Sequence, residues 1–201
     1  MSSVKMLGGF RHRLRLLPSV FFRLELLLRG VKWCPPLHLV GRPWLSLASG
    51  SEISLGPGVT LDSSRRANPL GGSMPCILKT LSSKAIIRLG KEVGVSSSSL
   101  VAGNRIEIGE GTLVGAGGLI MDNDLHKLDP RGRWQNEYVQ TSRPIKIGRN
   151  CFIGARAIIL KGVTLDDHVV IGAGAVVTKS FGPGAVVAGN PGRQVGTLPG
   201  V

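Results

Sequence analysis

The chain is poor in cysteine, aromatic residues and long apolar runs. Its 201 residues include only three cysteines, with no CxxC spacing, so the sequence predicts neither a disulfide framework nor a zinc knuckle. Cys151 is expected to be a buried thiol, and free cysteines fit a reducing cytoplasm. Aromatic residues make up 4% of the chain, so a core has to be built from aliphatic side chains. No uninterrupted apolar stretch of about 18 residues occurs, and a membrane-spanning helix is not expected.

Acidic residues are also scarce, and the resulting basic excess is concentrated at the start of the chain. The whole sequence has a net charge of +13, and residues 1–36 carry seven lysines and arginines against the single acidic Glu25. Apolar residues such as Phe21, Leu24 and Leu28 lie between these charges at helical spacing. We expect residues 1–36 to form a basic amphipathic helical segment. Two roles stay open, contact with an anionic inner membrane surface or capping of the domain that follows. Nucleic acid is not an expected partner, because no recognised binding motif accompanies the charge.

The sequence is rich in glycine and shows a repeat of six residues. From Ile147 to Val177 an aliphatic residue recurs at every sixth position. Neither a helix nor a single strand has this period, whereas hexapeptide repeats are typical of parallel β-helices. The full series is Ile147, Ile153, Ile159, Leu165, Ile171 and Val177. Upstream the period continues at Ile77, Leu89, Val95 and Val101 and, after a slip of one residue, at Ile108, Val114 and Ile120, and a weaker set at Leu47, Ile53 and Val59 precedes both. The sequence therefore predicts an all-β solenoid domain over residues 37–189, of roughly seven triangular coils, with a tail at 190–201.

One long interruption breaks the rhythm between Ile120 and Ile147. Residues 121–146 are expected to leave the coils as a protruding loop, and such excursions from a rigid scaffold commonly carry function. The loop holds a single histidine, His126, among several carboxylates. An imidazole whose tautomer is fixed by a carboxylate has the properties of a general base, although an exposed histidine in a polar turn is the structural alternative.

Four motifs follow one another in the second half of the chain. They are His126-Lys-Leu-Asp-Pro, similar to a loop motif HPLDP, then PIKIGRNCFIGARAIILKGVTL at 144–165, IGAGAVVTKS at 171–180 and VAGNPGR at 187–193. In this order they resemble the hexapeptide-repeat O-acetyltransferases, left-handed parallel β-helix enzymes that include the maltose and galactoside acetyltransferases and acyltransferases of polysaccharide biosynthesis.

The resemblance implies a reaction and a set of site residues. Acetyl-CoA would donate its acetyl group to a carbohydrate hydroxyl by direct attack, with His126 as general base and Asp124 as the carboxylate that orients it. Asp122 and Asp129 compete with Asp124 for that role. The positions implied for the donor are Ala155, Ala173, Thr178, Lys179 and Arg193, and ordinary packing or a solvated corner is their structural alternative. The positions expected near the acceptor are Ser96, Asn104 and Trp134, and no metal site is expected.

The resemblance also implies a homotrimer whose active sites lie between subunits, working in the cytoplasm or at the inner face of the membrane. Monosaccharides, nucleotide sugars and lipid-linked sugars all stay open as acceptors, and acyl groups longer than acetyl stay open as donors. Two other classes are considered. One is a non-catalytic β-helix that acts as a scaffold or binds a ligand. The other is a metal-dependent hydratase of the γ-carbonic anhydrase type, which needs three histidine ligands, whereas two of the four histidines here precede the repeats.

Overall fold

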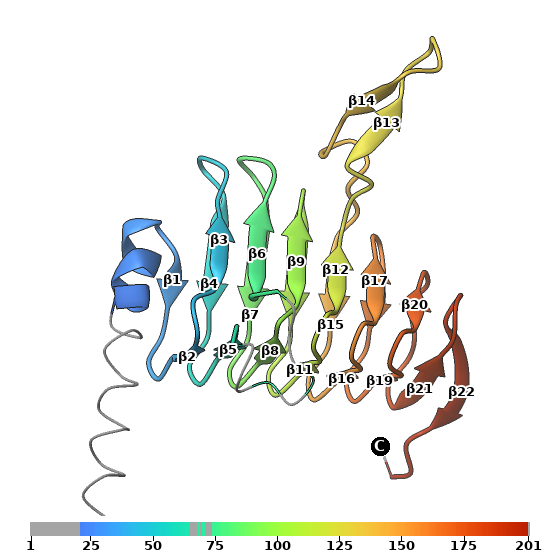
Figure 1. Ribbon diagram of the computed structural model, residues 1–201. Coiled ribbons are helices and arrows are strands. Elements are labelled where there is room, and N and C mark those ends of the chain that lie inside the picture. The colour runs from blue at the N-terminus through green and yellow to red at the C-terminus, as the bar shows by residue number, and fades with distance from the viewer. Residues whose placement is uncertain (1–20, 65–67, 69, 71–73, 201) are drawn as a thin grey trace, which may run out of the picture.

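The repeats form a triangular prism with one strand of each coil in each of three sheets (Figure 1). A computed structural model describes residues 21–64, 68, 70 and 74–200. Sheet A contains β1 (Lys32–Trp33), β4 (Glu52–Leu55), β7 (Ile86–Leu89), β10 (Arg105–Ile108), β15 (Ile145–Ile147) and β18 (Thr164–Leu165). Sheet B contains β2 (His38–Val40), β5 (Thr60–Asp62), β8 (Gly94–Ser96), β11 (Leu113–Val114), β16 (Phe152–Ile153), β19 (Val170–Ile171), β21 (Ala185–Ala188) and β22 (Arg193–Thr197). Sheet C contains β3 (Trp44–Ser46), β6 (Ile77–Thr80), β9 (Ser99–Ala102), β12 (Leu119–Met121), β17 (Ile158–Leu160) and β20 (Val176–Val177).

The six-residue period determines the register between coils. Residues three hexads apart are paired in parallel, so that Ile147 lies beside Leu165 in sheet A. Ile153 lies beside Ile171 in the same way. Each pair points into the prism, where at most 1% of any of these side chains is exposed. Stacked aliphatic ladders of this kind form one continuous core, and the expected left-handed parallel β-helix is confirmed.

The register predicted for the repeats in the first half of the chain is wrong at some positions. Ile77 and Val101 are only partly buried, and the core positions are their neighbours Leu78 and Leu100, both with 0% exposure. Successive side chains on a strand point to opposite faces, so an error of one residue exchanges core and surface. Both faces of these strands carry aliphatic residues, which removes the alternation that would have corrected the register.

A helical segment covers the N-terminal end of the prism (Figure 1). Residues 21–28 are helical, and Leu26 joins the core with 1% exposure. Residues 1–20 of the expected helical segment lie outside the described residues. In the described part of the chain, no helix has both the length and the apolar character needed to cross a membrane.

At the other end, the last strand reverses direction. β22 pairs antiparallel with β21, whereas all the other pairings of sheet B are parallel. The parallel ladder of sheet B therefore ends at β21, and a returning strand covers its edge (Figure 1).

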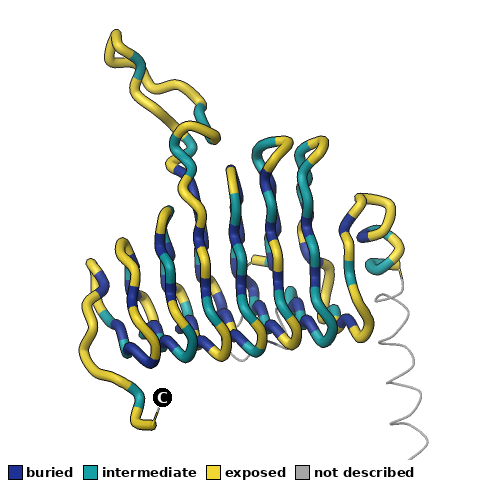
Figure 2. Tube along the Cα trace, turned by 180° about the vertical axis from the view of Figure 1, so that it is seen from behind, coloured by how far each residue is buried: buried dark blue, intermediate teal, exposed yellow. Residues whose placement is uncertain are grey.

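The protruding segment is an ordered hairpin rather than an irregular loop. Its strands β13 (His126–Leu128) and β14 (Trp134–Asn136) pair antiparallel and stand away from the prism (Figure 1). All six residues of these strands are exposed, in contrast with the buried ladders of the coils (Figure 2).

Candidate active site

The hairpin leaves the prism at a buried aspartate. Asp122 has 0% exposure, and its carboxylate accepts hydrogen bonds from the backbone N–H groups of the preceding coil corner. These donors are Gly103 at 2.6 Å, Asn104 at 2.8 Å and Arg105 at 2.7 Å. Asn123 Nδ2 adds a fourth donor at 2.9 Å. Three amides converging on one carboxylate fix the point at which the chain departs from the coil.

The segment that returns from the hairpin packs closely against the same coil corner. A Cβ atom on Gly103 would lie 2.7 Å from the carbonyl oxygen of Tyr138 and would also overlap Ser142 Oγ. Ser142 Oγ donates a hydrogen bond to that Tyr138 carbonyl. Only glycine fits between the coil corner and the segment that returns from the hairpin. Both ends of the hairpin are therefore held against one coil.

His126, Asp124 and Trp134 line an open pocket of about 640 Å³ beside the hairpin. Trp134 is 72% exposed and pairs with Leu128. This pair lies two positions along the hairpin from the pair formed by His126 and Asn136. Within the described ranges, the His126 imidazole makes no hydrogen bond or ion pair to another side chain. The ring is free to bind a ligand, as a general base must be before its substrate arrives.

Asp124 has a partner other than His126. Its Oδ2 accepts a hydrogen bond from Lys161 Nζ, which lies at the coil corner directly after β17. The lysine was not identified from the sequence. Its position is nevertheless a regular one, because the β17–β20 register places Lys161 one coil before Lys179. The lysine thus connects the base of the hairpin to the edge of sheet C.

The other two carboxylates of the hairpin serve its local structure. Asp122 is occupied by the coil corner, as described above. Asp129 lies in the tip turn, where its Oδ1 accepts from the backbone N–H groups of Arg131 at 2.8 Å and Arg133 at 2.9 Å. The Arg133 backbone N–H holds the pKa of Asp129 below its usual value, despite an opposing effect of desolvation. Of the three candidates, Asp124 is the one that shares a pocket with His126.

The alanines expected near the donor are stacked at one edge of sheet C. Ala155 O accepts from Gly174 N at 2.9 Å, so that the turn holding Ala173 lies directly on the turn holding Ala155. A Cβ on Gly154 would lie 2.6 Å from Ala173 N, which shows how closely these corners approach. Ala155 is half-buried and Ala173 is exposed.

Thr178 and Lys179 lie at the opposite edge of sheet C, directly after β20. Both are exposed, and Lys179 Nζ lies 5.6 Å from the centroid of the Phe181 ring. Arg193 is exposed at the start of β22. It is held close to β20, because the N–H of its neighbour Gly192 donates to Val176 O at 2.7 Å.

The two polar positions expected near the acceptor are not brought together. Ser96 ends β8 on the alanine side of sheet C, whereas Asn104 follows β9 on the hairpin side, where its backbone N–H binds Asp122. A single chain thus gathers His126, Asp124 and Trp134 in one pocket and leaves the donor positions along the two edges of sheet C. No group of three histidine, cysteine, aspartate or glutamate side chains suited to a metal ion occurs in the described ranges.

The outer face of sheet C is strongly apolar, a feature that the six-residue period did not predict. The register aligns Leu119, Ile158 and Val176 in one outward row and Met121 and Leu160 in the next. All five are only partly buried in the single chain. Their signal in the sequence is aliphatic residues on both sides of the core position, as in AIIL at 157–160.

Sheet A differs from sheet C in the character of its outer face. Its outward row includes Arg88, Glu107 and Lys146 in register, with Arg88 and Glu107 joined by an ion pair at 3.3 Å. A charged outer face is suited to solvent, whereas the apolar face of sheet C leaves a large uncovered surface.

Comparison with known proteins places the similarity in the same coils. Residues 144–179 match the family described as the hexapeptide repeat of succinyl-transferase. Galactoside O-acetyltransferase from Escherichia coli is 50% identical over 54 residues, 27% of each chain. Nodulation protein L from Rhizobium meliloti is 46% identical over 92 residues, 46% of this chain and 49% of its own. The matched stretches thus span less than half the length of these two relatives.

Solved structures share the fold over most of the chain. AntD, an N-acyltransferase from Bacillus cereus crystallised with dTDP-4-amino-4,6-dideoxyglucose and coenzyme A, superposes with a TM-score of 0.65 at 16% identity. The superposition covers 87% of this chain and 88% of AntD. The polySia specific acetyltransferase NeuO superposes with a TM-score of 0.54 at 18% identity and covers 82% and 74% of the two chains. The resemblance read from the motifs is confirmed.

Proposed function

We propose that this chain, a hexapeptide-repeat β-helix similar to sugar acetyltransferases, transfers an acetyl group from acetyl-CoA to a carbohydrate hydroxyl. The observation that carries the proposal is the His126 imidazole, unpaired within the described residues and facing an open pocket with Asp124 and Trp134. Galactoside O-acetyltransferase, similar over part of the repeats, acts on a sugar according to its name. AntD, which shares the fold, binds coenzyme A and a nucleotide sugar.

The proposed reaction is a direct transfer with His126 as general base. The imidazole takes the proton of the acceptor hydroxyl while the oxygen attacks the thioester carbonyl. The tetrahedral intermediate then expels the CoA thiolate, which recovers the proton from the imidazolium, so that the products are an acetyl ester and free CoA. Base catalysis of this kind contributes roughly 10²–10⁴-fold, and the remainder of the acceleration comes from holding the two substrates together.

Asp124 and Trp134 have supporting roles in this proposal. Asp124 keeps a carboxylate beside the imidazolium as it forms, and Lys161 holds that carboxylate against the coil. Trp134 presents an exposed indole to the same pocket, and a sugar ring packs well on such a surface. Ser96 and Asn104 complete the acceptor side only when a second subunit is considered, because they lie on opposite edges of sheet C.

We propose that the donor, acetyl-CoA, binds along the edges of sheet C. The small side chains of Ala155 and Ala173 leave room for the pantetheine arm along their corner. Lys179 and Arg193 supply cations for the nucleotide phosphates, and Thr178 adds a hydroxyl at the edge of β20. The AntD complexes contain a CoA ligand on the same fold, which supports a donor of this type.

We further propose a homotrimer in which the apolar face of sheet C is covered by neighbouring copies. His126 and the donor positions do not share a pocket in the single chain, and a neighbouring prism against sheet C would bring them together. Sedimentation should give three times the chain mass of 21.2 kDa. A monomer at assay concentration would contradict the shared site. A cytoplasmic location is proposed because all three cysteines are free thiols, which suits a reducing compartment. Surface-polysaccharide synthesis is the proposed context.

Turnover with substituted His126 tests the function. Release of CoA from acetyl-CoA would be measured by chromatography against a panel of monosaccharides, nucleotide sugars and lipid-linked sugars. We expect His126→Gln to lower kcat by roughly 10²–10⁴-fold while CoA binding, measured by calorimetry, is retained. His168→Gln is the matched control, because His168 lies at a coil corner between β18 and β19.

Two outcomes would contradict the proposal. Full activity in His126→Gln would show that another group is the base. A wild-type chain that binds CoA but acetylates no member of the panel would favour the non-catalytic ligand-binding alternative.

A further inference from the structure

We propose that the helix at residues 21–28 docks the protein on an anionic lipid surface through Phe21, Leu24, Leu27 and Leu28. These four large apolar side chains are 69%, 54%, 56% and 80% exposed. The inference is independent of the acyl-transfer proposal, because it concerns the end of the prism rather than the hairpin pocket.

The helix has two distinct faces. At about 100° per residue, the four exposed residues fall on one arc of roughly 120°. The opposite arc holds Leu26, which is buried, and Phe22, which is half-buried. The usual surface helix turns its polar side to solvent. This helix instead turns a wholly apolar arc outward, and no side chain in the described part of the chain covers it.

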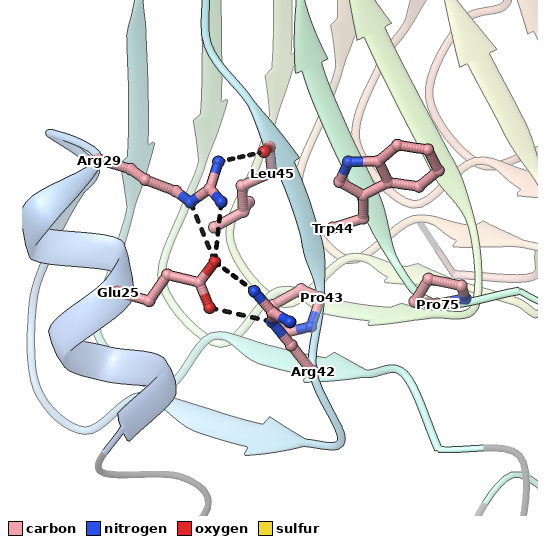
Figure 3. A pocket seen from close by; sticks show the side chains of 7 residues that line it. All are labelled: Glu25, Arg29, Arg42, Pro43, Trp44, Leu45 and Pro75. Atoms are coloured by element: carbon pink, nitrogen blue, oxygen red, sulfur yellow. Dashed lines mark hydrogen bonds and ion pairs between the residues drawn. The ribbon is translucent and has the colours of Figure 1, made fainter.

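Ion pairs and hydrogen bonds fix the helix in this orientation (Figure 3). Glu25 accepts two hydrogen bonds from Arg42, at 2.9 and 3.0 Å, and one from Arg29 at 3.0 Å. Arg29 Nη1 also reaches the Leu45 carbonyl at 3.0 Å. The hydrogen bonds from Arg42 are the main reason that the pKa of Glu25 lies below its usual value, against an opposing effect of desolvation. The polar side chains of the helix thus bind it to the first coil of the prism.

A further contact holds the first described turn of the helix. Arg23 Nη2 donates to the Leu37 carbonyl at 2.6 Å. Because Arg23, Glu25 and Arg29 fasten the described turns of the helix to the first coil, the apolar arc cannot rotate inward without breaking these contacts. Both roles expected for this segment therefore have a structural basis, since one face covers the prism and the other is left for a partner.

The charge around the helix identifies that partner. Residues 1–46 contain eight lysines and arginines against one acidic residue, Glu25. An apolar arc in a strongly basic stretch of sequence is the combination that binds anionic bilayers, in which acyl chains receive the apolar side chains and headgroups attract the cations. A second copy of this chain would bring the same positive charge against itself, which disfavours helix-to-helix pairing.

Vesicle partitioning of the full chain tests the proposal. The probe is vesicles of equal parts phosphatidylglycerol and phosphatidylcholine, with pure phosphatidylcholine as the uncharged comparison. The variant Phe21→Gln, Leu24→Gln and Leu28→Gln removes most of the arc and keeps good helix formers. The matched control is Leu113→Gln with Phe152→Gln, two apolar residues of sheet B that are 51% and 49% exposed.

We expect the helix variant to lose at least about tenfold in partitioning to the anionic vesicles, since each buried apolar side chain adds to binding. The sheet B variant should bind as the wild type does, and binding should weaken with salt and in uncharged vesicles. Far-ultraviolet circular dichroism and thermal unfolding establish that both variants are folded.

Three results would overturn the inference. The first is wild-type partitioning by the folded helix variant, which would assign membrane attraction to charge alone. The second is an equal loss in both variants. The third is a helix variant whose sedimentation changes while its vesicle binding does not, which would make this face a contact between copies.

Discussion

Replacing the buried Asp122 by asparagine should weaken the chain where the hairpin leaves the prism. Oδ1 accepts from Gly103 N and Asn123 Nδ2, and Oδ2 accepts from Asn104 N and Arg105 N. An amide retains one acceptor oxygen and presents an NH₂ group at the other position. Whichever way the amide is placed, two donors lose their acceptor.

The size of the effect follows from these contacts. Each donor left without a partner costs about 1–3 kcal/mol when buried, and the exposed Asn104 can recover part of its loss from water. We expect Asp122→Asn to lower the free energy of unfolding by about 2–5 kcal/mol, a large share of the roughly 5–15 kcal/mol typical of a folded domain. The assay is urea unfolding together with hydrogen exchange of the Gly103 and Arg105 amides, which should accelerate.

A matched substitution separates this effect from a general loss of charge. Asp166 is exposed, and its side chain makes no hydrogen bond within the described residues. Asp166→Asn should change the free energy of unfolding by less than about 0.5 kcal/mol. If Asp122→Asn unfolds at the same urea concentration as this control, the carboxylate does not hold the root of the hairpin.

Two further predictions concern titratable groups. Burial raises the pKa of the Cys76 and Cys151 thiols. At pH 8 a thiol reagent should therefore modify the exposed Cys34 rapidly and the two buried cysteines only on unfolding. Rapid modification of all three cysteines in the native protein would show that the coils open. Hydrogen bonding by the Arg133 backbone N–H holds the pKa of Asp129 below the usual 3.8. The ionised carboxylate therefore stabilises the hairpin tip above pH 3.8, and the tip loosens as the pH falls through the lowered pKa. Loss of hydrogen-exchange protection at the Arg133 amide already near pH 5 would contradict this prediction.

The second half of the fold was predictable because its repeats are regular. Ile147, Ile153 and Ile159 each have an aliphatic counterpart three hexads later, and every one of these positions is buried. In the first half, Ile77 and Val101 occupy outward positions next to core residues of similar character. Hydrophobicity alone cannot choose between two adjacent aliphatic residues, because the choice depends on the neighbouring coils.

The candidate site was predictable only in part, because some of its contacts join residues that are far apart in the sequence. The break in the period placed His126 on a protruding segment, and its proximity to Asp124 and Trp134 followed from the hairpin. The contact between Asp124 and Lys161 joins residues far apart in the sequence, and no local pattern indicates it. The apolar outer face of sheet C was also missed, since a period of six reports the inward residues and says nothing of those beside them.

The reversal of β22 limits how far the solenoid can extend. Every parallel strand of a coil offers its free edge as a template for the next, and an unblocked edge would accept a coil from another molecule. β22 occupies the edge of β21 in the opposite sense, so that sheet B cannot add a further parallel strand there. A chain in which this strand were detached would expose the edge of β21 to a strand of another molecule. Because helical residues 21–28 cover the opposite end of the prism, such pairing would join two C-terminal ends rather than build a filament.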